Sequence, residues 1–435
     1  MYEIINWIDS DFDSAPQTVS VIDKNRIICG INDYFLSFEP DNYECKISAL
    51  MFERVSDDIL KDIQSRKTVT IACDNVSIPM MKIIAEFNRT HHDCRITVRE
   101  YSRFYESDIP GFSKFNRDLI SGVIPDIVIN NGTIDMKRYS QLGMFTDLNS
   151  LIDGDAGIDR SDYYNSVFNS FSEDGKIYEL PLFFGLKEII GKEADTQNIE
   201  ELSYDALIRL SEEKRLFTNS ADELVTELIK NNIAEFVDFK NYSCDFNNDD
   251  FKDILKLIDR ESVDGTVHDG RVSKDFQDNK CTFELCGLNR YVISEIADMI
   301  NEPVVYINYP SIKSSGTLVD SHFSVAVTEK SGKKEYAWEF IKILLSDEFQ
   351  NSYDRGDYRN FEIPVKRTAA EICIKNDSER INKLIDNASR SVVKDSRINM
   401  IIDEQTDLYF SGSQSAEETA DNIQKKVSLY LKEIR

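Results

Sequence analysis

Four short segments between residues 69 and 184 decide the fold of this chain: VTIAC (69–73), SGVIPDIVI (121–129), YSQLGMFTDL (139–148) and DGKIYELP (174–181). The first is a short apolar run typical of a buried strand, and a polar loop and a helix that ends near Asn88 follow it. From Lys67 onward, strand and helix patterns alternate in the same way. This alternation predicts an α/β architecture with a parallel sheet.

The bulk composition narrows the classes of protein that fit. The 435 residues exceed one typical core and predict two or three domains. A hydrophobic fraction of 41%, with 11% aromatic residues, supports packed interiors and excludes global disorder. The formal charge of −27 argues against a nucleic-acid binder, because an acidic surface repels a phosphate backbone.

Targeting and redox signals are sparse. No apolar run approaches the ~18–20 residues that a membrane helix needs. The chain begins with MYEI, which reads as a strand and not as a signal peptide. Eight cysteines are scattered along the chain, and we expect most of them to be small buried hydrophobic residues, with disulfides left open.

Residues 1–60 differ from the rest of the chain in their pattern of apolar and turn-forming residues. Apolar segments separated by Asp, Asn, Pro and Gly predict a meander of antiparallel strands, at Glu3–Ile8, Thr18–Ile22, Arg26–Ile31, Tyr34–Phe38 and Lys46–Val55. A sheet this small is only marginally stable by itself. It therefore packs on the main body, pairs with a partner or forms the end of a larger all-β domain, and we favour the last of these. Ser56–Arg66 then reads as a charged linker or short helix.

Helix signals are clear in the remaining chain. Ser77 is placed to cap a helix, and capping boxes begin at Ser220 and Ser415. Gly122 stops the helix that contains Phe115 and Leu119. Apolar residues at helical spacing predict buried faces at Phe251, Ile254, Leu255 and Ile258, and at Ala337, Phe340, Ile341 and Leu344.

Taken in order, the four segments at the start resemble the extracellular solute-binding proteins of ABC importers, the maltose-binding-protein-like family 1. AWEFIKILLS (337–346) is similar to the late helix of that family, and IPVKR (363–367) to the segment after it. The resemblance covers Lys67 to the C-terminus and leaves the first sixty-odd residues unexplained. Its motifs identify the family better than the ligand.

The resemblance implies a type II periplasmic-binding-protein fold, with two α/β lobes around a central ligand cleft. The first lobe is expected at 67–182 plus 321–354 and the second at 185–317 plus 361–435, beside the N-terminal β segment at 1–60. The family captures a solute by hinge closure and delivers it to a membrane permease, without catalysis and without a cofactor. It also implies an extracellular or periplasmic location, an export signal and a lipid anchor; we expect a monomer.

Candidate ligand-binding residues come from two arguments. In open parallel sheets ligands bind beyond the carboxyl ends of strands, which here selects Asp74, Asn75, Asn130, Asn131, Phe183 and Phe184. The polar side chains would serve solute hydroxyls, and of the two rings we expect one to be core and the other exposed for stacking. By resemblance, Asn289 and Arg290 abut the cleft; Tyr309, His322 and Tyr358 are added because they lie at a strand end, at the recrossing and after the late helix.

Each candidate also has a plainer explanation. Asp74 and Asn75 suit a helix cap, Asn130 and Asn131 suit a turn, and a phenylalanine is usually core. In the possible calcium loop that starts at Asp153, Ile158 and Tyr164 stand where an EF-hand needs Gly and Glu. The cluster at 91–94 is expected on an outer edge, so no metal site is predicted. No Ser-His-Asp grouping, Walker sequence or GxGxxG is present.

The sequence therefore predicts a solute-binding protein whose first-choice ligand is a carbohydrate or oligosaccharide. Two Trp in the chain weaken that choice, and polyamines, a metal chelate or a peptide stay open. One alternative is a carbohydrate-active enzyme that uses two carboxylates at one cleft. Another is a sensor or scaffold protein with a degenerate binding fold.

Overall fold

A computed structural model describes residues 16–36, 43–102, 111–196, 199, 202–263, 272–299, 302–312, 316–352 and 362–434. Strands in the first half of the described chain are β1 (Thr18–Val21), β2 (Arg26–Leu36), β3 (Tyr43–Glu53), β4 (Lys67–Cys73), β5 (Cys94–Glu100), β6 (Ile127–Asn130), β7 (Ser172–Glu173), β8 (Lys176–Ile177) and β9 (Leu180–Lys192). Those in the second half are β10 (Val237–Asp238), β11 (Ser243–Cys244), β12 (Phe283–Leu288), β13 (Val304–Asn308), β14 (Thr317–Val327), β15 (Ile363–Pro364) and β16 (Ala388–Ser391).

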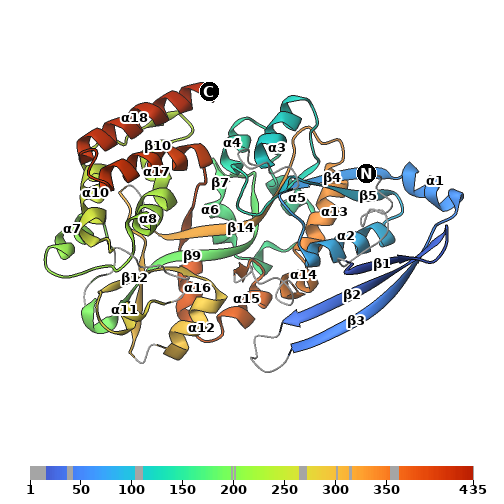
Figure 1. The fold of residues 1–435 in the computed structure, drawn as a ribbon, viewed down its shortest axis with the longest axis horizontal. Coiled ribbons are helices and arrows are strands. Elements are labelled where there is room, and N and C mark those ends of the chain that lie inside the picture. Colours follow the sequence, from blue (N-terminus) through green and yellow to red (C-terminus); the bar gives the residue numbers. More distant parts are fainter. Residues whose placement is uncertain are drawn as a thin grey trace.

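Nine of the described strands form one mixed sheet. Its main path runs β12-β9-β14-β6-β4-β5, with β13 and β15 also paired to β9 and β16 paired to β14. Strands β5, β4 and β6 are parallel, whereas β14 runs antiparallel to β6 and β9. The long strands β9 and β14 cross the middle of the molecule and connect its two sides (Figure 1). The α/β fold predicted from the alternating pattern is confirmed, but the predicted parallel sheet is mixed, because the strands paired to β9 are all antiparallel to it.

Helices pack around both ends of this sheet (Figure 1). On one side lie α1 (Asp57–Ser65), α2 (Ile78–Thr90), α3 (Gly111–Ile120), α4 (Met136–Gln141), α5 (Asn149–Gly154), α6 (Asn165–Ser170), α13 (Lys334–Leu344) and α14 (Asp347–Ser352). On the other lie α7 (Tyr204–Ser211), α8 (Ala221–Leu224), α9 (Ile233–Phe236), α10 (Asp249–Glu261), α11 (Lys274–Gln277), α17 (Ser396–Phe410) and α18 (Ala416–Glu433). Below the crossing strands are α12 (Arg290–Met299), α15 (Arg367–Ile374) and α16 (Ser378–Asp386).

The predicted helix starts are confirmed by their hydrogen bonds. The Ser77 side chain accepts from the backbone N–H of Met80, and full capping boxes form at Ser220 and Ser415. Gly122 follows α3 with φ of 80°, a left-handed conformation that favours glycine. The apolar faces predicted on α10 and α13 are fully buried. Local sequence signals therefore fix these helix boundaries.

Apolar side chains gather into separate clusters. The largest surrounds β4, α2, α13 and the first half of β9, while a second joins α7, α10, α17 and α18. A smaller one lies between β4, α3 and α4. Strand β9 contributes to both large clusters, with Leu186 and Ile190 in the first and Ile189 in the second. Strands β14 and β13 pair with one of its edges and β15 and β12 with the other. This strand is therefore buried through most of its length.

The N-terminal strands form a sheet of their own. Strands β1, β2 and β3 pair antiparallel, as predicted, but β2 is continuous where the sequence predicted two strands at Arg26–Ile31 and Tyr34–Phe38. Ser56 caps α1, which confirms the short helix predicted within Ser56–Arg66. The predicted strand at Glu3–Ile8 lies outside the described residues.

Two bulk predictions can be compared with the described chain. The seven cysteines whose side chains are described are free thiols, and five of them are buried, as expected for small hydrophobic residues. Among the described helices, none has the length and apolar character that crossing a membrane would require.

Candidate functional site

Two adjoining cavities open where strand β6 ends and the chain enters α4. The inner cavity has a volume of about 100 Å³, and its polar lining includes Asn130, Lys137, Glu173, Glu179, Ser321 and Ser391. The outer cavity has a volume of about 420 Å³, and its polar lining includes Asp135, Thr226, Lys230, Asn231, Ser396 and Asn399. Both are lined by Val392, Val393 and Lys394, in the segment between β16 and α17.

The turn after β6 places α4 beside these cavities. The Asn130 side-chain oxygen accepts hydrogen bonds from the backbone N–H groups of Gly132 at 2.9 Å and Ile134 at 3.1 Å. Gly132 has φ of 84°, and a Cβ atom there would lie 3.0 Å from the His322 ring. Glycine therefore permits both the left-handed turn and the close approach of β14.

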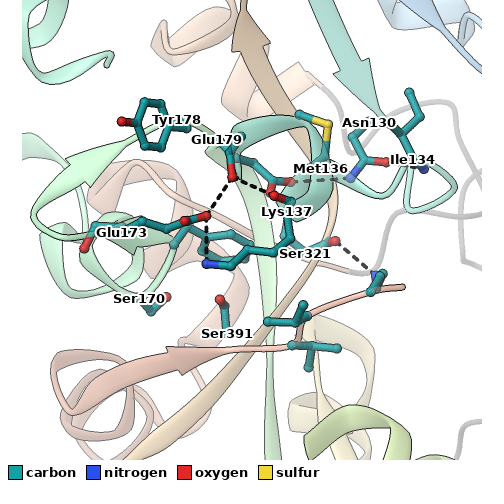
Figure 2. Close-up of a pocket in the computed structure, with 16 residues that line it drawn as sticks. Asn130, Ile134, Met136, Lys137, Ser170, Glu173, Tyr178, Glu179, Ser321 and Ser391 are labelled. Atoms are coloured by element: carbon teal, nitrogen blue, oxygen red, sulfur yellow. Dashed lines mark hydrogen bonds and ion pairs between the residues drawn. The ribbon is translucent and has the colours of Figure 1, made fainter. Parts of the chain in front are cut away.

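An ion pair forms one wall of the inner cavity. Lys137 Nζ lies 2.7 Å from Glu173 Oε1, and the Ser140 hydroxyl donates to the same oxygen at 2.7 Å. The Lys137 and Glu173 side chains are 28% and 26% exposed, so both remain reachable from the cavity. Figure 2 shows them side by side. This wall offers a cation and a carboxylate to a polar solute at adjacent positions.

Glu179 is a further carboxyl in the lining of the inner cavity. Its Oε1 accepts from the Asn130 amide at 3.4 Å (Figure 2). The same oxygen accepts from the Ser324 hydroxyl. Burial raises the pKa of Glu179 above its ordinary value, although these hydrogen bonds and the positive charge of Lys394 act in the other direction. The carboxyl therefore takes up a proton more readily than an exposed glutamate.

Lys394 connects the crossing strand β14 to the shared wall of both cavities. Its Nζ lies 2.9 Å from Asp320 Oδ1 and donates to the Ser321 carbonyl at 3.2 Å. Burial opposes ionisation of Asp320, but the charges of Lys394 and His322 outweigh it and lower the Asp320 pKa to about 2. Asp320 is consequently ionised at neutral pH, and its contact with Lys394 holds the segment before α17 in place.

The far wall of the outer cavity is an irregular helix. After α8, a π-helical stretch at Val225–Ile229 and a 3₁₀ turn at Lys230–Asn232 precede α9. These changes of register leave Thr226, Lys230 and Asn231 on the cavity. Lys230 Nζ pairs with Asp403 at 2.8 Å. π-helical insertions are frequent at functional sites, which suits this position.

Some sequence-predicted residues do meet at the edge of the sheet. The Asn131 amide donates to the Asn75 carbonyl at 3.1 Å and to its side-chain oxygen at 3.2 Å, which connects the ends of β4 and β6. Asp74 precedes Asn75, and its carbonyl accepts from the backbone of Ser102 at 2.8 Å. Of these four polar candidates, Asn130 alone lines one of the two cavities.

His322 lies beside this group and is well exposed. Its side chain is 60% exposed, and Nδ1 lies 3.0 Å from Glu362 Oε1. The hydrogen bond to Glu362 raises the His322 pKa, and the carboxylate of Asp320 adds to the effect. His322 therefore sits at the predicted recrossing of the chain, next to the cavities and outside their lining.

The prediction that Phe183 or Phe184 presents an exposed ring is wrong. Both belong to β9 and are 2% and 0% exposed. Phe183 packs against Phe323 and Phe349, and Phe184 packs edge-on to Tyr164. Because β9 is paired on both edges and covered by helices, neither side of the strand faces solvent. Neither ring offers a stacking face to a solute in this arrangement.

The remaining candidates lie away from the two cavities. Tyr309 is 2% exposed, and its hydroxyl donates to Glu227. The Asn289 side chain accepts from Val292 N–H at 3.0 Å and so caps α12, of which Arg290 is the first residue. The predicted place of Asn289 and Arg290 at the cleft is not seen in the lining of either cavity. Tyr358 lies outside the described residues.

Sequence reasoning missed most of the lining. Glu179 stands inside DGKIYELP and Glu173 directly before it, yet that segment was used for the fold alone. Lys137 lies on α4, which the turn after β6 places beside the cavity. Lys394 belongs to a segment more than 250 residues later in the chain. Glu179 within this motif and Glu173 before it are a usable sequence signal, whereas no local pattern points to the two lysines.

Among the described residues, no group of three or more His, Cys, Asp or Glu side chains is placed to hold a metal ion.

The family described as bacterial extracellular solute-binding protein matches residues 82–380, which is more than half of the chain. The chain belongs to this family. No curated protein is matched as a close relative by sequence.

Solved structures share the fold of this solute-binding protein. The sugar-binding protein MalE from Xanthomonas citri is similar with a TM-score of 0.57 and 13% identity, over 84% of this chain and 98% of that one. A periplasmic oligogalacturonide-binding protein from Yersinia enterocolitica is similar with a TM-score of 0.57 and 14% identity, over 84% of this chain and 99% of that one. An ABC substrate-binding protein from Listeria monocytogenes, in complex with cycloalternan, is similar with a TM-score of 0.53 and 14% identity, over 84% of this chain and 99% of that one. These likenesses identify the periplasmic-binding-protein fold.

Proposed function

We propose that this solute-binding protein captures a carbohydrate or oligosaccharide in the two adjoining cavities and delivers it to an ABC permease by hinge closure. The observation that carries the proposal is the composition of the cavity walls. They combine α4 and the β7 region with the irregular helix at 225–232 and the segment before α17. These segments come from both sides of the molecule (Figure 1), so a solute held there touches each side. A ligand with contacts on both sides favours the arrangement that brings them together.

The charges of the lining favour a neutral solute. Lys137, Lys230 and Lys394 are each paired with a carboxylate, at 2.7, 2.8 and 2.9 Å, so an anion would have to compete for them. The side-chain oxygen of Asn399, which lines the outer cavity, is buried and has no hydrogen-bond partner. A hydroxyl group is the donor that would satisfy it without adding charge. Sugars supply many such hydroxyls.

The proposed moving parts follow the predicted division of the chain. We assign 67–182 plus 321–354 to one lobe and 185–317 plus 361–435 to the other, with β9 and β14 as the crossing segments between them. Residues 1–60 are proposed as a separate β unit, in keeping with the self-contained β1–β3 sheet. The proposed protein is a lipid-anchored, extracellular monomer without catalytic activity.

Named structural neighbours support the choice of ligand class. The similar proteins from Xanthomonas citri, Yersinia enterocolitica and Listeria monocytogenes are described with a sugar, an oligogalacturonide and cycloalternan. Their identity to this chain is 13–14%, so the ligand of each belongs to that protein. They make saccharides the first class to test, ahead of polyamines, peptides and metal chelates.

A thermal-shift screen tests the proposal. Neutral oligosaccharides, uronates, polyamines, amino acids and metal chelates are added to the protein, and a solute that binds the folded state raises the melting temperature. We expect a neutral saccharide to give the largest shift, and Lys137→Met to reduce it. A shift from charged solutes alone would contradict the ligand class. Steady release of shorter sugars from a bound oligosaccharide would instead identify a hydrolase.

A further inference from the structure

One contact joins the two proposed lobes directly beside the outer cavity. Asp135, in the turn before α4, accepts two hydrogen bonds at Oδ1 from Ser396, the first residue of α17. The backbone N–H donates at 3.1 Å and the hydroxyl at 2.9 Å. Both residues line the cavity. An opening motion that separates the lobes would break both bonds.

A second carboxyl stands at the same joint. Asp395 precedes Ser396 and caps α17 by accepting from Ile398 N–H at 2.9 Å. Its other oxygen accepts from the Tyr430 hydroxyl at 3.1 Å, and the residue is 2% exposed. Asp135 is partly buried, and the charge of Asp395 disfavours the ionised form of Asp135.

The other charged groups around this pair do not cancel the effect. Arg138, on the next turn of the chain, favours the ionised form of both carboxyls. Lys230 and Lys394 also line the cavity, but Asp403 and Asp320 already pair with them.

The neighbouring tyrosines add no charge of their own. Burial raises the pKa of Tyr139 and of Tyr430, so both stay neutral through the physiological range. Burial and the charge of Asp395 therefore have the largest effects on whether Asp135 is ionised. Burial first, and the charge of Asp395 second, raise the Asp135 pKa to about 6, against the Ser396 hydrogen bonds and Arg138.

We propose that the Asp135–Ser396 contact is a proton-sensitive latch, in which uptake of one proton by the Asp135–Asp395 pair favours the closed arrangement of the lobes. The inference rests on the hinge motion in the proposed function. With the lobes apart, Asp135 faces water and ionises as an ordinary aspartate. When they close, the carboxyl is buried against Asp395, so closure takes up a proton and becomes easier as the pH falls.

The distance between the lobes tests this proposal without a solute. Spin labels carried by non-natural amino acids are placed at Glu86 on α2 and Asp259 on α10, which are exposed, so the native thiols need no removal. Pulsed electron resonance then gives the populations of short and long distances. We expect the ratio of closed to open molecules to rise roughly tenfold from pH 8 to pH 5.

Asp135→Asn separates the charge from the hydrogen bonds. The asparagine oxygen still accepts from Ser396 and carries no charge, so we expect the short distance to predominate at both pH values. Asp174→Asn is the matched control, because Lys240 and Asp174 form another ion pair between the proposed lobes at 2.8 Å, with both side chains more than 70% exposed. This control should keep the pH dependence of the wild type.

The outcomes distinguish the latch from the hinge. A wild-type distance that changes when a solute binds, but not between pH 8 and pH 5, would overturn the latch and leave the hinge intact. A pH response as large in Asp135→Asn as in the wild type would overturn it as well. A single distance under every condition, including a saturating solute that raises the melting temperature, would overturn both the hinge and the latch.

Discussion

Two groups of polar side chains near the end of β6 differ in how their hydrogen bonds are used. Asn75 and Asn131, at the strand ends, bond to each other across the sheet edge. Lys137, Glu173 and Glu179 face the inner cavity from three different segments. Short side chains at a strand end reach nearby backbone and pair locally, whereas longer ones from separate segments meet across a space. The position of a site therefore follows from the strand ends, and its lining follows from tertiary structure.

The largest expected effect concerns the rings of β9, which separate core packing from binding. Phe184→Ala removes a fully buried ring that packs against Tyr164. We expect the free energy of unfolding to fall by about 3–5 kcal/mol, as for other buried Phe→Ala changes. Denaturant unfolding measures this fall, and calorimetry on the folded variant should show unchanged solute affinity. A large loss of affinity at full stability would return Phe184 to the binding site.

The next prediction compares a carboxyl in the core, Glu188, with the cavity carboxyl of Glu179. Glu188 is 0% exposed on β9, and neither carboxylate oxygen has a hydrogen-bond partner. Burial raises its pKa to about 8, although nearby Thr317 and Arg390 oppose the shift. The folded state thus holds a proton that the unfolded chain releases, and the free energy of unfolding falls as the pH rises from 5 to 8, by up to about 1.4 kcal/mol per pH unit.

Glu188→Gln should remove this part of the pH dependence. The amide is neutral at every pH, so the variant should gain stability over the wild type as the pH increases toward 8. Urea unfolding at pH 5, 6, 7 and 8 measures the difference. Parallel pH profiles for the two proteins would show that Glu188 is ionised in the folded state, contrary to its buried position.

A smaller effect tests the cavity wall. Lys137→Met keeps much of the side-chain volume but removes the charge beside Glu173, and we expect the affinity for the solute to fall roughly tenfold, the worth of about one charged hydrogen bond. Lys176→Met is the matched control, because Lys176 is an exposed lysine of β8 outside both cavity linings. Calorimetric titration compares the two. Equal losses would mean that overall charge, and not the inner cavity, sets the affinity.

The smallest effect is expected at the strand-end pair. Asn131→Ala breaks the bonds to Asn75 and should lower the free energy of unfolding by about 1 kcal/mol, with the solute affinity within about twofold of wild type. Thermal unfolding with and without solute measures both quantities. A strong loss of affinity would place the solute over the edge of the sheet, where the sequence alone located it.

The sequence predicts the fold well and the cavity lining poorly, for a physical reason. Capping boxes at Ser220 and Ser415 and the apolar faces of α10 and α13 are local patterns, and the structure has each of them. The lining depends on long-range neighbours instead. Lys394 reaches the cavity because its segment follows β16, which pairs with β14. The burial of Phe183 and Phe184 is not predicted because residues distant in the sequence, Phe349 and Tyr164, pack on the two rings.

Hydrogen exchange with and without the saccharide that gives the largest thermal shift tests the central claim most directly. If the solute lies between α4 and the segment before α17, amide exchange should slow at residues 131–140 and 391–399 together. It should stay unchanged at 289–296, where Asn289 caps α12. Slower exchange at 289–296, with none at 131–140 or 391–399, would contradict capture in these cavities.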